Sequence, residues 1–107
     1  MSQVRAVDHK ALEQLRHDAA QTPRKRLHLN VHRGYEENPQ ILYNCLTRGS
    51  YMRPHRHTQD GRKEFFVCLN GEALLVIFTE TGEVDATFSM AAGGQSKVSS
   101  VMVEPSA

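Results

Sequence analysis

From residue 25 onward the chain is a succession of short, β-prone runs separated by turn residues, and this pattern limits the folds that the chain can adopt. In the first run Leu27, Leu29 and Val31 alternate with polar residues, which is typical of a strand with one apolar and one polar face. The later runs are Gln40–Leu46, Ser50–His57, Glu64–Leu69, Glu72–Thr79, Val84–Met90 and Lys97–Val103. No helical crossover falls between them, so the sequence predicts an all-β barrel or jelly roll and not a parallel sheet.

Glycine-containing turns separate the later runs. Asn70-Gly71 lies between two apolar runs, and Asn-Gly in that context is the strongest short-range hairpin signal. We therefore expect Glu64–Leu69 and Glu72–Thr79 to pair as a hairpin. Thr81-Gly82 and Ala91–Gly94 predict the next two turns.

Only the start of the chain is predicted to be helical. Asp8 suits an N-cap, apolar residues recur on one face from there to about residue 20, and Thr22-Pro23 ends the pattern. A chain of 107 residues is long enough for one hydrophobic core and too short for two independent ones. We expect a single domain over residues 1–107, with the helix at about 8–20 and the barrel at about 25–105.

The charge balance excludes several classes of function. With 13 basic and 12 acidic residues the net charge is +1, so no global field attracts nucleic acid or an acidic membrane. The basic run Pro23–Arg26 is short and carries no interleaved aromatic residue. No run approaches the roughly 18 to 20 apolar residues that span a bilayer, and the polar N-terminus lacks the apolar core of a secretion signal. We expect a cytoplasmic protein that binds neither nucleic acid nor membranes, with Cys45 and Cys68 unbridged.

His55 and His57 are separated by one residue and form the clearest candidate metal site. In an extended segment both side chains leave the same face, with Cα atoms about 6.8 Å apart, so both imidazoles can reach one ion. Pro54 limits the local backbone freedom and helps to orient the pair. Glu64 opens the next run and can add a carboxylate oxygen. Such a mixed nitrogen and oxygen set suits Fe(II), Mn(II), Zn(II), Ni(II) or Cu(II).

The spacing of these residues resembles the first conserved motif of the cupin superfamily. Gly49, five residues, His55-Arg56-His57, then Glu64, six residues and Gly71 follow the pattern G-x5-H-x-H, spacer, E-x6-G. The spacer between His57 and Glu64 is six residues, longer than usual. The resemblance implies a cupin-type jelly-roll barrel with these three residues as metal ligands.

A narrower resemblance covers nearly the whole chain. The opening helix, Thr22–His32 and Gly49–His57 look like the WbuC family of cupin-fold metalloproteins. Proteins of this kind are associated with bacterial surface-polysaccharide gene clusters. The resemblance therefore implies a divalent transition metal (Fe, Mn, Zn or Ni) and a small-molecule ligand such as a sugar or a sugar nucleotide.

Cupins carry a second motif, which supplies a third histidine near the end of the barrel. Here the sequence stops at residues 103–107, about where the turn leading to that histidine is expected. We therefore expect weaker metal binding unless water or another side chain completes the site. We also expect an open strand edge, which a second copy of the chain covers in a homodimer.

Further polar residues are candidates for the ligand site. His28, Asn30 and His32 fall on the polar face of the first strand, and in a small barrel that face can point into the cavity. We expect His28 and Asn30 to contact substrate and His32 to act as an acid or base near neutral pH, with metal ligation as its alternative role. Arg53 and Tyr51 share the face of His55 and are candidate substrate contacts; a solvated arginine and a core tyrosine are the alternatives.

Two classes of function remain open from the sequence, and a third possibility is a degenerate protein that folds poorly or only as an oligomer. In the first, the metal polarises an oxygen-bearing small molecule as a Lewis acid in an enzyme. In the second, the barrel is a non-catalytic module that recognises a metabolite or carbohydrate. A general base beside the metal distinguishes the two, and His28 and His32 are the candidates for it.

Overall fold

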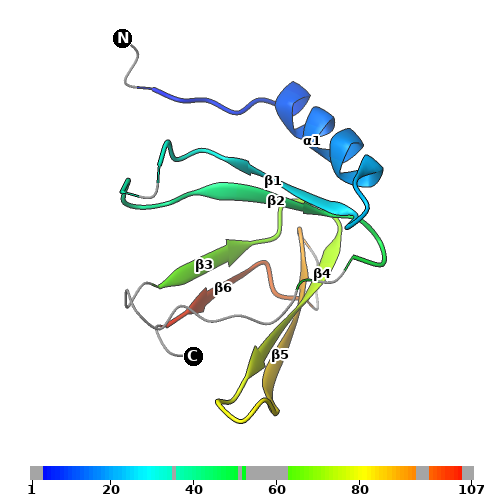
Figure 1. Ribbon diagram of the computed structural model, residues 1–107. Coiled ribbons are helices and arrows are strands. Elements are labelled where there is room, and N and C mark those ends of the chain that lie inside the picture. The colour runs from blue at the N-terminus through cyan, green and yellow to red at the C-terminus, as the bar shows by residue number, and fades with distance from the viewer. Residues whose placement is uncertain (1–3, 35, 51, 53–62, 94–96, 105–107) are drawn as a thin grey trace. The chain divides into compact units, whose positions relative to one another are not determined.

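The computed structural model describes residues 4–34, 36–50, 52, 63–93 and 97–104 (Figure 1). The chain divides into two compact units, Met1–Arg53 and Pro54–Ala107. Most regular structure in the described residues is β-strand, and one short helix precedes the strands. The expectation of one domain over 1–107 stays a prediction.

Helix α1 spans His9–Gln21 in the first unit, as the sequence predicted. The Asp8 carboxylate accepts a hydrogen bond from the Ala11 N–H at 2.9 Å, which satisfies one of the donors that a helix leaves open at its start. The chain leaves the helix at Thr22, whose N–H donates to the Ala19 carbonyl. Leu15 and Ala19 are buried, so the helix is anchored by one apolar face.

Removing the Asp8 cap is expected to destabilise this unit measurably. Asp8→Ala leaves the Ala11 N–H without its partner and should lower the free energy of unfolding by about 1 kcal/mol. Asp8→Asn keeps a side-chain oxygen at the cap and should stay close to the wild type. Urea titration followed by circular dichroism measures both, and equal losses in the two variants would contradict the capping role.

Strands β1 (Arg26–Asn30) and β2 (Leu42–Leu46) form an antiparallel hairpin against which α1 packs (Figure 1). Their register runs from Arg26 opposite Leu46 to Asn30 opposite Leu42. Because side chains alternate along a strand, the hairpin has two different faces. The half-buried face consists of Leu27, Leu29, Tyr43 and Cys45. The predicted alternation of the first strand is therefore confirmed, with its apolar side in the core of this unit.

The second unit contains β3 (Glu64–Val67), β4 (Glu72–Phe78), β5 (Val84–Ala91) and β6 (Ser100–Val103). All pair antiparallel, β4 with β5 and β3 with β6. The turn at Thr81-Gly82 is confirmed, because the Thr79 N–H donates to the Glu83 carbonyl at 2.8 Å and closes the β4–β5 hairpin.

The predicted hairpin at Asn70-Gly71 is wrong, because β3 and β4 belong to different sheets. A type I′ turn needs positive φ at both central residues, and here Gly71 has a φ of 71° while Asn70 does not share the left-handed conformation. The Cys68 N–H instead donates to the Ser99 carbonyl at 2.9 Å, so the chain is still paired with the β6 side when it reaches the turn. The segment is a corner that carries the chain from one sheet to the next.

The strand pairs of the second unit are nested. The β4–β5 hairpin lies innermost along the chain, and the β3–β6 pair encloses it. Val98, which precedes β6, forms an isolated parallel bridge to Met90 of β5. The Ala91 N–H donates to the Val98 carbonyl at 3.0 Å, and the Val98 N–H donates to the Ser89 carbonyl at 2.9 Å. The described residues thus form three open two-stranded sheets, and no closed barrel is present among them. The predicted strand at 50–57 lies outside the described residues, apart from Ser50 and Met52.

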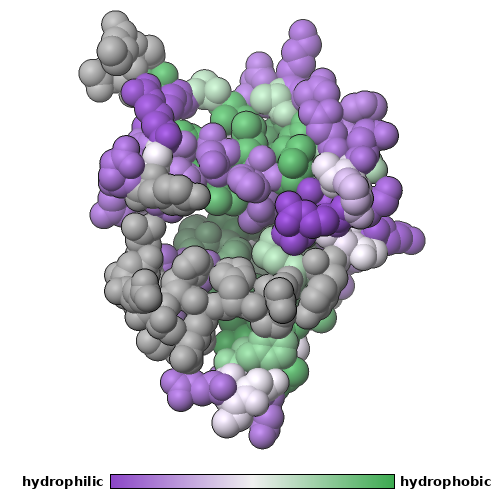
Figure 2. Space-filling view, in the orientation of Figure 1, coloured by the Kyte–Doolittle hydropathy of each residue, from purple (hydrophilic) through white to green (hydrophobic). Residues whose placement is uncertain are grey.

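Apolar side chains line one face of the β4–β5 hairpin. Met90 is buried, and Leu75 opposite Phe88 and Ile77 opposite Ala86 are half-buried on the same face as Met90. Ala91, the next residue along β5, is also buried. The opposite face leaves apolar side chains at the surface, and Figure 2 shows hydrophobic residues exposed over this hairpin. The core of this unit is therefore built from alternate residues of two strands.

Candidate functional site

Glu64 is the one predicted metal ligand that lies among the described residues. His55 and His57 lie outside them, as do the candidate substrate contacts Arg53 and Tyr51. The described part of the chain contains no group of three or more histidine, cysteine, aspartate or glutamate side chains that could hold a metal ion. Because two of the three predicted ligands are not described, the metal site stays a prediction.

The carboxylate of Glu64 belongs to the half-buried face of the β3–β6 sheet. Along β3 Glu64 and Phe66 are half-buried, whereas Phe65 and Val67 are exposed. Glu64 lies opposite Val103, which is also half-buried. A carboxylate at such a position can bind a metal ion as well as hydrogen-bonding or positively charged groups. The position is therefore compatible with the predicted role as a ligand.

An open hollow of about 300 Å³ adjoins this strand pair. It is formed by β4, β5 and β6 together with the residue after β6, and its walls are mostly apolar. The lining residues are Ile77, Ala86, Phe88, Val101, Met102, Val103 and Glu104. Val103 thus connects the hollow to the cross-strand position of Glu64. A concave apolar surface with Glu104 in its lining and Glu64 on the neighbouring strand suits a small molecule that has an apolar part and a polar group.

The second face of the β1–β2 hairpin carries polar side chains, as the sequence predicted. His28 and Asn30 are exposed there, and His28 lies opposite Asn44. Imidazole and amide groups both donate and accept hydrogen bonds, so this face can bind hydroxyl groups. Asn44 is not among the predicted site residues because it lies within an otherwise apolar run. Only the strand register places it beside His28.

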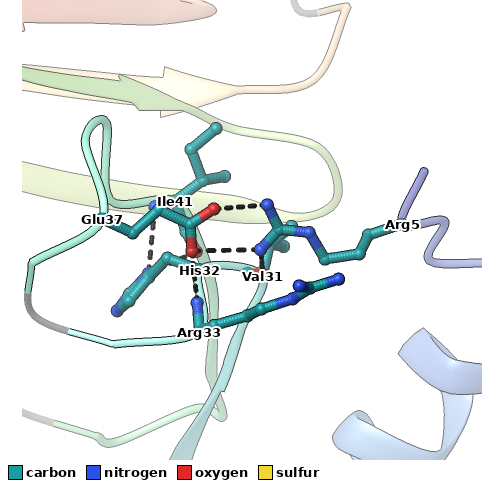
Figure 3. A network of polar contacts seen from close by, with 6 residues as sticks. All are labelled: Arg5, Val31, His32, Arg33, Glu37 and Ile41. Carbon is teal, nitrogen blue, oxygen red and sulfur yellow. Dashed lines mark hydrogen bonds and ion pairs between the residues drawn. The ribbon is translucent and has the colours of Figure 1, made fainter. Parts of the chain in front are cut away.

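His32 lies two residues beyond the end of β1, not on the strand as predicted. Its N–H and that of Val31 both donate to the Ile41 carbonyl, at 3.2 and 2.8 Å, which ends the regular pairing. The His32 Nδ1 atom lies 2.9 Å from the Ile41 carbonyl oxygen and 3.0 Å from the Ile41 N–H nitrogen (Figure 3). In either tautomer Nδ1 is held by the Ile41 backbone, so Nε2 is the nitrogen available for proton transfer or ligation.

An ion pair fixes the loop that carries His32 to the N-terminal segment (Figure 3). The Arg5 guanidinium binds the Glu37 carboxylate through both of its terminal nitrogens and also donates to the Val31 carbonyl at 2.7 Å. The Arg33 backbone N–H donates to the same carboxylate. The hydrogen bonds from Arg5 and from Arg33 lower the pKa of Glu37 from 4.5 to about 2.

This lowered pKa predicts a pH-dependent contribution to stability. Because the pKa of Glu37 is lower in the folded than in the unfolded chain, the stabilisation is complete above about pH 4.5 and is lost as the pH falls toward 2. Glu37→Gln should therefore lower the melting temperature at pH 7, and the difference from wild type should shrink at pH 2 to 3. The effect is modest because both side chains are partly exposed, at 37% and 29%. Calorimetric melting across this pH range measures it, and a difference independent of pH would contradict the assignment.

The cysteines do not form a bridge. Cys45 and Cys68 are free thiols, and both are half-buried. Cys45 lies opposite Leu27 in the core of the first unit. The Cys68 Sγ atom lies 3.5 Å from the Gly71 carbonyl oxygen, at the corner between β3 and β4. These surroundings are those of small packing residues.

Together these features describe a mostly β protein with one short N-terminal helix, a polar hairpin face in its first unit and an inward carboxylate in its second. Residues 7–90 match the family described as "Domain of unknown function (DUF6016)", and since this match covers well over half of the chain, the protein belongs to that family. Neither the search of curated proteins nor that of solved structures found a match. Among the described residues, no helix has the length and apolar character needed to cross a membrane.

Proposed function

We propose that this protein is a cupin-fold metalloprotein in which His55, His57 and Glu64 hold a divalent transition metal. The observation that carries the proposal is the position of Glu64, half-buried at the start of β3 and opposite a residue that lines the apolar hollow. The two histidines precede this strand by a short segment, and all three residues belong to the second unit. Two imidazole nitrogens and a carboxylate oxygen are a ligand set for Fe, Mn, Zn or Ni.

The strand pairing of the second unit supports a jelly-roll fold for this protein. A jelly roll is an antiparallel two-stranded ribbon that is folded over so that successive pairs enter different sheets. The nested β4–β5 and β3–β6 pairs follow this order, and the corner at Cys68–Gly71 is the place where the ribbon changes sheet. We also propose that the strands close into a barrel and that the protein is cytoplasmic.

The chemistry that we propose is Lewis-acid activation of a small oxygen-bearing ligand, such as a sugar or a sugar nucleotide. A metal bound by three side chains polarises an oxygen atom placed at an open position. His28 and Asn30 remain proposed ligand contacts, and His32 remains the proposed acid or base, through its Nε2 atom. Arg53 and Tyr51 remain proposed ligand contacts, and a homodimer remains the proposed assembly.

Metal uptake tests the proposal without knowledge of the substrate. The full chain, purified after growth in medium supplemented with Fe, Mn, Zn and Ni, should retain one of these metals after gel filtration. Glu64→Gln keeps the size of the side chain but removes the charge, and should lower the retained fraction. Glu72→Gln, at the exposed first residue of β4, is the matched control. Retention that is the same in all three proteins would contradict the role of Glu64.

A further inference from the structure

The end of α1 leads into the start of the β1–β2 hairpin (Figure 1), and the chain segments that meet there carry Arg24, Arg26 and Arg48. Arg26 opens β1 opposite Leu46, and the pairing continues beyond the strands because the Thr47 N–H donates to the Lys25 carbonyl at 2.9 Å. Beyond this bond both segments turn. Arg24 lies in the turn that the Lys25 N–H closes on the Thr22 carbonyl at 3.1 Å, and Arg48 lies in the turn that the Ser50 N–H closes on the Thr47 carbonyl at 3.0 Å. The Ser50 hydroxyl donates to the Arg24 carbonyl at 3.4 Å and keeps the two chain segments together.

Within the part of the chain that the structure describes, none of these arginines forms an ion pair. The ion pairs there involve Arg5, Arg16, Lys63 and Lys97. Lys25, which lies between Arg24 and Arg26, has its ammonium group at the carbonyl of Ala20 near the end of α1, 3.2 Å away. Positive charges on neighbouring chain segments repel one another, so a bound anion would stabilise this arrangement.

Arg26 adds an independent observation. Its Nε atom is buried and, among the described residues, has no hydrogen-bond partner. A buried donor without a partner is rare in folded proteins and calls for an explanation. A guanidinium group that binds an oxyanion side-on uses its Nε–H together with one terminal N–H, so an anion at this site would satisfy the donor.

The backbone around the cluster is held in place before any ligand binds. The Thr22 hydroxyl accepts a hydrogen bond from the Arg26 N–H at 3.2 Å and lies 2.9 Å from the Ala19 carbonyl oxygen, to which it can donate. Lys25 adopts a φ of 58°, in the left-handed region that few non-glycine residues occupy. Such conformations persist where the surrounding structure fixes them, and they are enriched at binding sites.

We propose that Arg24, Arg26 and Arg48 form an anion site that binds the phosphate group of a small molecule. Three guanidinium groups match a doubly charged phosphate or a diphosphate better than a singly charged carboxylate. The cluster is short, contains no aromatic residue and belongs to a chain of net charge +1, which disfavours nucleic acid. The site uses no residue of the proposed metal centre and does not depend on it.

Isothermal titration calorimetry of the full chain with inorganic pyrophosphate tests the proposal. We expect saturable binding that is weakened about tenfold by Arg24→Gln or Arg48→Gln, because each change removes a charge-assisted hydrogen bond. Arg26→Lys keeps the charge but loses the planar fork, and should also weaken binding. Arg16→Gln removes an arginine that is already paired with Glu13 on α1 and should leave binding unchanged. Circular dichroism confirms that each variant is folded.

Two further titrations distinguish the arginine site from an anion bound at the metal and from a nucleic-acid surface. His57→Ala should bind pyrophosphate as wild type does, whereas loss of binding in this variant would place the anion at the metal and overturn the arginine site. A short single-stranded oligothymidylate should bind more weakly than pyrophosphate, and tighter binding of the oligonucleotide would replace the proposal by a nucleic-acid surface. Absence of saturable pyrophosphate binding, or equal binding by all arginine variants, would also refute the proposal.

Discussion

Met90→Ala is expected to lower the free energy of unfolding of the second unit by about 2 to 5 kcal/mol. Met90 is only 5% exposed and lies on the inner face of β5, where it is opposite Ala73 and forms the bridge with Val98. Truncation to alanine removes apolar contacts and leaves a cavity that the surrounding strands fill only in part. The effect is large because few residues of this unit are buried among those described, and Met90 is one of them.

Met102→Ala is the matched control for this prediction. Met102 loses the same atoms on truncation, but its side chain on β6 is 53% exposed. Its replacement should therefore change stability by no more than about 0.5 kcal/mol. Urea titrations of both variants, followed by circular dichroism, make the comparison. Equal losses at the two positions would show that Met90 is not part of the core.

Binding of a transition metal is expected to raise the melting temperature of the full chain. A ligand that binds only the folded state at 100 times its dissociation constant adds about 2.7 kcal/mol to stability. Differential scanning fluorimetry with Mn(II), Fe(II), Zn(II) and Ni(II), each added to chelator-treated protein, should show this shift for at least one ion. His55→Ala and His57→Ala should each abolish the shift, because two remaining ligands hold an ion far more weakly than three.

Two controls make this shift specific. His9→Ala removes an exposed histidine at the start of α1 and should leave the metal-induced shift unchanged. Mg(II), which prefers all-oxygen ligands, should give little or no shift. Equal shifts in wild type and in the His55 and His57 variants would mean that the stabilising ion binds elsewhere.

The local patterns of the sequence predicted the first unit well. An N-cap at Asp8 and the alternation around Leu27 and Leu29 depend on near neighbours in the chain, and both are confirmed. The corner at Asn70-Gly71 shows the limit of such reasoning. The dipeptide permits a tight hairpin, but whether β3 pairs with β4 or with β6 depends on contacts far along the chain, and the β3–β6 pairing is formed instead.

In the candidate site, too, some features follow from near neighbours in the chain and others depend on distant contacts. Alternation along one strand was sufficient to place His28 and Asn30 on an exposed polar face. Asn44 lies beside His28 because of the register between β1 and β2. The sequence of β2 alone does not predict this register. His32 lies outside the strand because two backbone N–H groups, those of Val31 and His32, share the Ile41 carbonyl and end the regular pairing. The apolar-polar alternation of the sequence continues through these residues, so it does not predict this break.

The claim on which the proposed function depends is that His55, His57 and Glu64 bind one transition-metal ion. Elemental analysis of the purified chain by inductively coupled plasma mass spectrometry, repeated on His55→Ala and His57→Ala, measures it directly. The proposal predicts a substantial fraction of one Fe, Mn, Zn or Ni ion per chain in the wild type and a marked loss in both variants. Metal content that is negligible in the wild type, or unchanged in both variants, would contradict it.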